Sequence, residues 1–469
     1  MFTPICEQNR SLLTWAPPSP SRQMKLSETV ALLREIHVAP VKSLGQNFLH
    51  DRNLSRWIVA GIGATSADYV VEIGPGLGAL TTFVLETGAR VLAIEKDGRL
   101  ADFLRSHLTD KRLEVRHEDA LEFDVRTLFA ERNVKLLGNL PYYISSQLLL
   151  KFLEYPSPIT LALLMLQKEM AARLAASPSS KDYGALTLLV QIHYRVEALR
   201  TIPATVFIPR PDVDSAVVRV TPRRADELPE CDDNLFARLV RRGFSQRRKQ
   251  LGKLLKEDIA DWTSAADALG FERQVRAEAL SLGQWIALTN YAGPLPPPDP
   301  SREGAERFPV VDENDLVLYG APRSKVHGDN LRHRAVHILI FNDAGEVFLQ
   351  KRSHRKDRHP LLWDSSAAGH VDAGEEYDAS ARRELKEELG IEVPLERVLK
   401  LPASSRTGEE FIWVYRGQYT GDFRLDRTEI ETGRFFPPDV VNGWIQARST
   451  DFAPGFLECW KAYGEANRG

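Results

Sequence analysis

Residues 70–79, with the sequence VVEIGPGLGA, constrain the fold of this chain more than any other stretch. Three β-prone residues lead into Gly74, Gly76 and Gly78, and the periodic apolar residues that follow predict a helix. Because glycine has no Cβ, backbone N–H groups at such a turn can approach a ligand closely. The glycines also fit a nicotinamide-binding fingerprint that permits Ala79 as its last residue. Alone, the motif indicates a nucleotide-like cofactor and leaves its identity open.

The composition is that of a cytoplasmic protein with several domains. At roughly 150 residues per domain, 469 residues suggest two to four domains. The net charge of −3 does not suggest nucleic acid, although a sum can hide a basic face. Cys6, Cys231 and Cys459 form no CxxC pair, which argues against a disulfide framework or a zinc site. No apolar run is long enough to span a bilayer, so we expect no membrane association.

Alternating segments predict an open α/β sheet in the first half of the chain. Residues 1–23 are Pro-rich without an apolar signal region, so we expect a disordered extension, with Met24 as an alternative start. Residues 24–222 then alternate β-like and helical patterns, which predicts a Rossmann-like domain. The expected strands are 69–73, 90–94, 113–117, 134–138 and 159–166. Residues 223–292 read as a small helical subdomain.

A basic helical segment spans residues 236–256 and carries eight Lys and Arg residues without an acid. A solvated helix face is the ordinary interpretation of such a run. Its length, and its position beside a nucleotide-binding domain, favour a surface that contacts phosphates. The candidate contact residues are Arg241, Arg242, Arg247, Arg248 and Lys249.

A Pro-rich segment separates the two halves of the chain. Residues 293–300 read GPLPPPDP, a composition that favours extended polyproline II and a semi-rigid spacer. We therefore expect a linker at 293–307 between mechanically independent units. The second unit, 308–469, begins a new α/β pattern with strands at 336–341 and 347–351 around a turn at 342–345.

Three polar residues follow the predicted strands of the first unit. Glu95 comes twenty-one residues after Gly74, where a carboxylate can accept hydrogen bonds from both ribose hydroxyls, although a surface acid at a strand end is equally common. Asp119 and Asn139 follow the next two strands. Open α/β sheets bind ligands in the crevice at these carboxyl ends.

The run Asn139-Leu-Pro-Tyr142 suits methylation of an exocyclic amine. Hydrogen bonds from an adenine amine to the Asn139 oxygen and a backbone carbonyl would localise the nitrogen lone pair. Pro141 removes a competing backbone donor, and Tyr142 offers a face for stacking the base. Such catalysis is mostly positioning and electrostatics.

Taken together, these motifs resemble the ribosomal RNA small-subunit adenine dimethyltransferase family, over residues 25–292. The matching segments are KSLGQNFL at 42–49, EIGPGLG at 72–78, Glu95-Lys96, Asp119-Ala120, NLPYYI at 139–144, Gln167-Lys-Glu169, Tyr183-Gly184 and VFIPRP at 206–211. A nicotinamide dehydrogenase would leave Asn139–Tyr142 without a role. A DNA adenine methyltransferase more often has D/N-P-P-Y, and a transcription factor of this fold that has lost activity is a further alternative.

The resemblance implies a reaction and a set of site residues. Two adjacent adenosines near the 3′ end of 16S (small-subunit) ribosomal RNA, in a pre-30S particle, would each be methylated twice. Tyr142 and Phe207 would flank the base, with Asn139 and Pro141 beside them, and the basic segment would bind RNA. S-adenosylmethionine would be held by Gln46, Asn47, Leu49, Gly74, Gly76, Glu95, Asp119, Ala120 and Asn139.

The second unit carries a different motif. Residues 369–375 and 383–391 fit the Nudix box, G-x5-E-x7-R-E-U-x-E-E-x-G-U, at every fixed position. On the predicted helix 378–389, Glu384 and Glu388 lie one turn apart with Glu387 adjacent. Carboxylates this crowded favour Mg²⁺ or Mn²⁺, which would activate water against a diphosphate. Glu387 is the candidate catalytic residue, and Arg383 can orient a carboxylate.

The substrate of this unit is less constrained. The region resembles the branch close to isopentenyl diphosphate isomerase, but residues 365–368 read SSAA and lack the isomerase cysteine. We therefore expect a pyrophosphohydrolase acting on a small nucleotide or diphosphate. A non-catalytic nucleotide- or RNA-binding module and an isomerase-like enzyme are the alternatives. Glu409 and Glu410 are candidate additional acids, and Lys351 and Arg352 candidate phosphate contacts.

Overall fold

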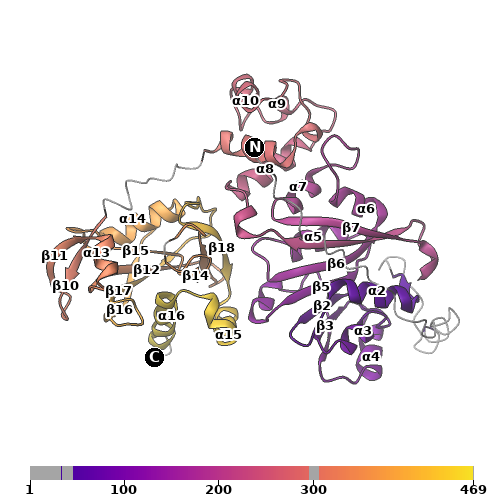
Figure 1. Cartoon of the computed structure of the whole chain (residues 1–469), viewed down its shortest axis with the longest axis horizontal. Helices are drawn as coiled ribbons and strands as arrows, with labels where there is room; N and C mark the ends of the chain where they lie inside the picture. The colour runs from indigo at the N-terminus through magenta and orange to yellow at the C-terminus, as the bar shows by residue number, and fades with distance from the viewer. Residues whose placement is uncertain (1–32, 34–45, 295–305, 357, 468–469) are drawn as a thin grey trace, which may run out of the picture.

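The structure is a computed structural model that describes residues 33, 46–294, 306–356 and 358–467. They form two α/β units, an N-terminal unit (46–294) and a C-terminal unit (306–467), as Figure 1 shows. Among these residues, no helix is both long and apolar enough to cross a membrane. The expected extension 1–23 and most of the linker 293–307 lie outside the described residues.

The N-terminal unit is built on a seven-stranded sheet of order β4-β3-β2-β5-β6-β9-β7. The strands β4 to β6 are parallel, and β9 and β7 run antiparallel beside them. All five predicted strands are confirmed and begin at the predicted residues. Their bounds are β2 (Tyr69–Ile73), β3 (Arg90–Glu95), β4 (Leu113–His117), β5 (Val134–Asn139), β6 (Ile159–Gln167), β7 (Tyr194–Ile202) and β9 (Ser215–Pro222).

Helices cover both faces of this sheet, so its central strands are apolar throughout. Every residue of β2 is buried, as expected for a parallel strand packed on both faces. Asp51 and Asp97 cap the helices α2 and α4 through side-chain hydrogen bonds, which fixes where these helices begin. The helices are α2 (Arg52–Ile62), α3 (Thr81–Glu86), α4 (Gly98–His107), α5 (Ser145–Phe152), α6 (Lys168–Leu174) and α7 (Ala185–Gln191).

The strand order reverses at β2. The chain runs from β2 outward to β3 and β4, and then returns to β5 on the other side of β2. The loops at the carboxyl ends of β2 and β5 therefore diverge and open a crevice. A two-stranded ladder of β1 (Phe48–Leu49) and β8 (Phe207–Ile208) pairs the segment before α2 with the segment after β7.

The subdomain after this sheet is helical, as predicted, but the basic segment is not one helix. It comprises α8 (Asp233–Gly243), α9 (Leu251–Leu254), α10 (Trp262–Leu269) and α11 (Leu282–Ala292). The helical segment predicted at 236–256 is divided between α8 and α9. A Cβ on Gly243 would lie 2.5 Å from Trp285 and 2.8 Å from Leu251. This close approach packs α8 against α11 and brings the chain back at α9, with a turn between them.

The C-terminal unit has a second seven-stranded sheet with helices on both faces. Its main order is β14-β13-β12-β17-β16, with β15 on β12 and β18 on β13. Helix α14 packs on one face, and α15 and α16 pack on the other. The bounds are β12 (His333–Phe341), β13 (Val347–Arg352), β14 (Trp363–Asp364), β15 (Ala367–His370), β16 (Glu396–Leu401), β17 (Glu410–Gln418), β18 (Ile430–Phe436), α14 (Tyr377–Leu389), α15 (Pro438–Arg448) and α16 (Pro454–Ala466).

A small hairpin precedes this sheet. Strands β10 (Arg307–Val311) and β11 (Val317–Pro322) pair antiparallel and lead into α13 (Arg323–Gly328). Phe308, Val310, Ala321 and Val326 form a separate apolar cluster that joins the hairpin to this helix.

The two units are docked against each other, contrary to the expected independence. Phe129, in the 3-10 helix η2 (Val125–Ala130) of the N-terminal unit, is only 5% exposed. Its ring centroid lies 4.5 Å from that of Trp444, 5.1 Å from that of Phe436 and 6.0 Å from that of Trp363. The C-terminal unit thus completes its aromatic core with a side chain from the other unit. The composition of a Pro-rich linker determines how the two units are connected. It gives no information about which surfaces of the units contact each other.

Polar contacts surround this aromatic insertion. Arg126 lies 2.7 Å from Glu346 and donates to the Phe435 carbonyl at 3.2 Å. A second set of contacts joins the Tyr155 hydroxyl to Glu431 at 2.5 Å and Glu154 to Arg434 at 2.6 Å. Burial and the adjacent Glu431 carboxylate raise the pKa of Tyr155, so it remains a hydroxyl donor.

We expect Phe129→Asp to separate the two units. The substitution places a carboxylate among three aromatic rings, which costs more than the ~3–5 kcal/mol of deleting a buried Phe side chain. Small-angle X-ray scattering should show a larger radius of gyration with unchanged far-ultraviolet circular dichroism. Tyr291→Asp changes an aromatic residue that is 39% exposed and should leave both signals unchanged. An unaltered radius for Phe129→Asp would contradict the docking.

Candidate functional site

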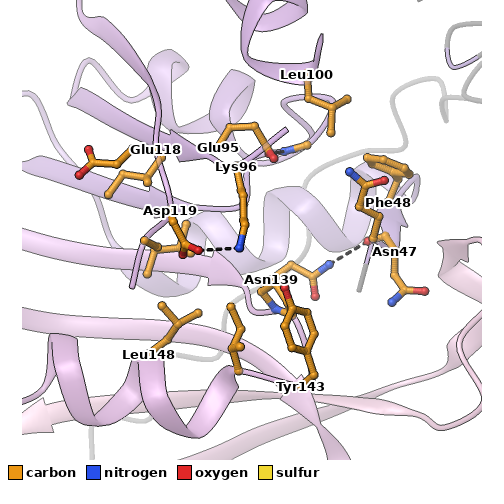
Figure 2. A pocket seen from close by; sticks show the side chains of 18 residues that line it. Asn47, Phe48, Glu95, Lys96, Leu100, Glu118, Asp119, Asn139, Tyr143 and Leu148 are labelled. Atoms are coloured by element: carbon orange, nitrogen blue, oxygen red, sulfur yellow. Dashed lines mark hydrogen bonds and ion pairs between the residues drawn. The ribbon is translucent and has the colours of Figure 1, made fainter. Parts of the chain in front are cut away.

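A pocket lies in the crevice where the strand order reverses. Figure 2 shows its side chains converging from the ends of several strands. It is lined by Gln46, Asn47, Phe48, Ile73, Gly74, Gly76, Ile94, Glu95, Lys96, Leu100, Glu118, Asp119, Ala120, Asn139, Pro141, Tyr143, Ile144 and Leu148.

The glycine turn after β2 forms one wall of the pocket. Gly74 has φ 65° and Gly76 has φ 58°, a backbone region that residues with a Cβ rarely adopt. A Cβ on Gly76 would lie 3.1 Å from the Phe48 ring, and one on Gly74 would lie 3.6 Å from the Asn139 carbonyl. Both glycines are therefore required by their backbone conformation, and Gly76 also by the ring that faces it.

Glu95 ties this turn to the end of β3. Its carboxylate accepts hydrogen bonds from the Gly76 N–H at 3.1 Å and the Asp97 N–H at 2.9 Å. Burial raises the pKa of Glu95, and these backbone donors oppose the shift. Glu95, which the sequence predicts to bind the ribose, thus also fixes the shape of the glycine turn. Its position in the sequence did not indicate this second role.

Asp119 is paired with Lys96, which the sequence interpretation did not include in the site. The Lys96 ammonium lies 2.5 Å from the Asp119 carboxylate, a contact that Figure 2 marks with a dashed line. Burial opposes ionisation of Asp119, but the hydrogen bonds from Lys96 and the Leu121 N–H, together with the charges of Lys96 and Lys151, lower the pKa of Asp119 overall. The Glu95-Lys96 motif could have indicated Lys96 as a site residue, but a role was assigned only to the glutamate.

Asn139 connects the pocket to the segment before β1. Its side-chain amide nitrogen donates to the Asn47 carbonyl at 2.9 Å. Gln46, the neighbour of Asn47, donates to Asp97 at 3.1 Å. Because the Asn139 nitrogen is engaged in this way, its side-chain oxygen is the atom suited to accept a hydrogen bond from a substrate amine.

The aromatic candidates differ in their placement. The Tyr142 hydroxyl bonds to Ser215 at 2.8 Å, whereas Tyr143 is 53% exposed and lines the pocket. Phe207 is 2% exposed and, like Leu49, belongs to the apolar core. The structure therefore brings neither Phe207 nor Leu49 to the pocket lining, and their binding roles stay predictions. Tyr143 directly follows the Asn139–Tyr142 motif, and this position could have indicated it as a pocket residue.

The basic segment keeps most of its cations on the surface. Arg241, Arg247, Arg248 and Lys249 are exposed. Arg242 lies 3.1 Å from Asp258 and also contacts Glu257, two acids just beyond the segment. Arg242 is therefore neutralised within the subdomain, whereas the turn after α8 presents three adjacent cations.

The C-terminal unit gathers buried carboxylates on α14. Glu388 accepts hydrogen bonds from Gln350 at 3.0 Å and from the Ala368 N–H at 3.1 Å. Burial raises the pKa of Glu388, and the nearby Glu384 raises it further. Burial also raises the pKa of Glu384, against the opposing charge of Arg383. Two neighbouring acids with raised pKa values can both be ionised when a bound cation compensates their charges. Glu384 and Glu388 therefore fit a divalent metal.

The backbone of β15 makes room for Glu384. A Cβ on Gly369 would lie 2.1 Å from the Glu384 carboxyl carbon, so glycine is needed there. Arg383 binds Glu375 through two hydrogen bonds of 3.2 and 2.9 Å, and also donates to Glu384 at 2.7 Å and Glu387 at 3.2 Å. The arginine orients the carboxylates as its position in the motif predicts.

Glu429 is an acid of this site that the motif did not reveal. Its charge raises the pKa of both Glu384 and Glu388. Burial opposes its own ionisation, but Lys356 pairs with it and lowers its pKa. Glu429 lies just before β18, 45 residues after Glu384 in the chain, so no local spacing indicates it.

The other candidates of this unit are engaged elsewhere. Glu410 contacts the histidines His333 and His370 at 3.5 and 3.3 Å. Lys351 pairs with Glu431 at 3.1 Å, and Arg352 pairs with Asp364 at 3.0 Å. Their proposed phosphate contacts stay predictions.

Family models match both units. The model "Ribosomal RNA adenine dimethylase" matches residues 40–293, and the NUDIX domain model matches residues 331–456. Ribosomal RNA small subunit methyltransferase A of Geobacillus thermodenitrificans is 39% identical over 270 residues, which cover 54% of this chain and 91% of that protein. The protein of the same name from Prosthecochloris aestuarii is 42% identical, covering 56% of this chain and 97% of its own.

Two solved structures are similar to the separate units. A dimethyladenosine transferase from Plasmodium falciparum has a TM-score of 0.46 at 24% identity, covering 52% of this chain and 98% of its own. DR0079 from Deinococcus radiodurans has a TM-score of 0.30 at 24% identity, covering 35% of this chain and 98% of its own. On its sequence matches, this chain belongs to the ribosomal RNA adenine dimethylase family and carries a NUDIX domain after the dimethylase region.

Proposed function

We propose that the N-terminal unit transfers methyl groups from S-adenosylmethionine to two adjacent adenosines near the 3′ end of 16S (small-subunit) ribosomal RNA, each twice. The hydrogen bonding of the Asn139 side chain is the main observation that supports this proposal. Its amide nitrogen is engaged with the Asn47 carbonyl, and its oxygen remains as an acceptor beside the pocket. Family membership supports both the methyl donor and an RNA substrate.

The chain's own residues have distinct tasks in this proposal. S-adenosylmethionine supplies an electrophilic sulfonium methyl when bound. The glycine turn leaves space for it, and Glu95 and Asp119, which line the pocket, offer carboxylate acceptors. Asn139 localises the adenine lone pair, and Tyr143 joins Tyr142 as a candidate to stack on the base. The exposed Arg247, Arg248 and Lys249 contact RNA phosphates.

We expect Gly76→Ala to weaken binding of S-adenosylmethionine. The added methyl group strains the positive φ and meets the Phe48 ring, a steric cost of about 1–3 kcal/mol. The dissociation constant measured by calorimetry should therefore rise about tenfold or more. Gly63→Ala is the matched control, because Gly63 also has φ 58° but has nothing within 4 Å of its Cβ position. Equal effects of the two changes on binding would contradict the assignment of this pocket.

We expect Asn139→Ala to abolish methyl transfer while S-adenosylmethionine binding is largely kept. Removing one positioned hydrogen-bonding group from a reacting centre costs about 100-fold or more in rate. The rate is measured with radiolabelled methyl donor and RNA that lacks the modification. Full turnover by the variant would refute the role given to the Asn139 oxygen.

We further propose that the C-terminal unit is a metal-dependent pyrophosphohydrolase of a small nucleotide or diphosphate. Glu384, Glu387 and Glu388 would hold Mg²⁺ or Mn²⁺, and the half-buried Glu429 joins them as a fourth acid. The metal supplies charge neutralisation of the diphosphate and an activated water. Glu387, which is less buried than Glu388 and touches Arg383, is the candidate base. Ser365 and Ser366 stand where an isomerase would need its thiol.

We expect Glu388→Gln and Glu387→Gln to lower metal-dependent phosphate release by about 100-fold or more, since each removes a carboxylate charge next to the metal. Release is measured over a panel of nucleoside di- and triphosphates and sugar derivatives. Glu392→Gln is the matched control, because Glu392 is exposed and pairs only with the surface residue Lys386 among the contacts described. If the wild-type chain binds nucleotides without releasing phosphate, the unit is a binding module.

A further inference from the structure

Four consecutive apolar side chains are exposed on the β10–β11 hairpin of the C-terminal unit. Leu316, Val317, Leu318 and Tyr319 are 63%, 54%, 60% and 49% exposed, and we call them the apolar patch. The other large apolar side chains that are exposed among the described residues occur singly, in the N-terminal unit. Single exposed apolar residues are normal on a protein surface, whereas a contiguous apolar patch indicates an interaction site.

The residue before the patch anchors it to the rest of the unit. Asp315 is only 7% exposed, although it lies at the tip of the hairpin. Its carboxylate accepts hydrogen bonds from Arg334 Nε at 2.7 Å and from the Tyr377 hydroxyl at 2.9 Å, and it also pairs with Lys400. These partners belong to β12, α14 and β16. The four apolar side chains that follow are therefore presented to solvent from a fixed backbone, which lowers the entropy cost of binding a partner.

Strand β11 is the outer strand of the hairpin. On its inner side it pairs with β10, whose Val311 N–H donates to the Arg332 carbonyl next to β12, and no described strand pairs with β11 on its other side. A bulge in the hairpin leaves Leu318 without a partner residue in β10. Residues 316–321 contain no charged residue and no proline, the side chains that commonly keep an open strand edge from contacting another chain. This strand is therefore suited to contact another chain.

The two ends of this strand differ in charge. Acids predominate at the end that precedes the patch, where the charged side chains are Asp312, Glu313 and Arg332. Bases predominate at the other end, where they are Arg307, Arg323, Lys325, Glu306 and Asp329. Two copies of the strand side by side would therefore place opposite charges together if they run antiparallel, and like charges together if they run parallel.

We propose that the apolar patch joins two copies of this chain, whose β11 strands lie antiparallel about a two-fold axis. Such a contact uses the same surface of both copies, so the surface must complement itself, as an apolar strand with oppositely charged ends does. Figure 1 shows the hairpin on the side of the C-terminal unit that faces away from the N-terminal unit. The contact therefore leaves the pocket of each N-terminal unit open.

Sedimentation velocity of the full chain, at concentrations from about 1 to 100 µM, tests the proposal. A contact built on one strand is smaller than a standard interface, so we expect a reversible dimer with a dissociation constant in the micromolar range. Leu318→Lys removes apolar contact and brings two ammonium groups together, and it should raise this constant about tenfold or more. Leu150→Lys is the matched control, because Leu150 is a 38% exposed leucine of the N-terminal unit, and it should leave the constant unchanged. A wild-type chain that is monomeric throughout this range, or a dimer that Leu318→Lys does not weaken, would overturn the proposal.

Charge reversal tests the antiparallel arrangement separately from the apolar contact. Glu313 and Lys325 are exposed and lie at opposite ends of the strand. Lys325→Glu should weaken the dimer, because each new carboxylate faces the acidic end of the other copy. Adding Glu313→Lys to this variant should restore the dimer, and raising the salt concentration should reduce the difference between the two variants. A double variant that dimerises no better than Lys325→Glu alone would contradict the antiparallel arrangement.

Discussion

The reversal of strand order at β2 is the constraint on which the N-terminal unit depends. Because the chain passes from β2 to β3 on one side and from β5 to β6 on the other, the loops after β2 and β5 diverge, and the glycine turn after β2 faces an open crevice. The Glu95 carboxylate holds that turn through the Gly76 N–H, and Asn139 holds the preceding segment through the Asn47 carbonyl. Two hydrogen-bonding side chains at strand ends thus define the walls of the pocket before any ligand is bound.

Much of this arrangement could be predicted from the sequence, because strands that are buried on both faces are continuous apolar runs. The starts of β2 to β6 and the extent of α14 follow from such local patterns. The Lys96–Asp119 pair, the burial of Phe207 and the approach of Glu429 to α14 could not be predicted in this way. Each depends on residues that are far apart in the chain and meet only in the folded protein.

The same limit applies to the contacts within and around the C-terminal unit. Local sequence patterns do not indicate that His327, His333 and His370, from α13, β12 and β15, converge in space. The composition of the linker likewise did not predict that Phe129 of the first unit packs beside Trp444 of the second. The aromatic core of the second unit is therefore shared between the two halves. This shared core gives the fusion a physical basis without requiring a common substrate.

The most direct test of the central claim is to map the methyl groups that the purified chain adds to small-subunit RNA from a strain that lacks the modification. The pocket, the Asn139 acceptor and the family assignment predict dimethylation at N6 of two adjacent adenosines near the 3′ end, with S-adenosylmethionine as the donor. Failure to incorporate any methyl group into that RNA, either free or assembled in small-subunit particles, would contradict the account.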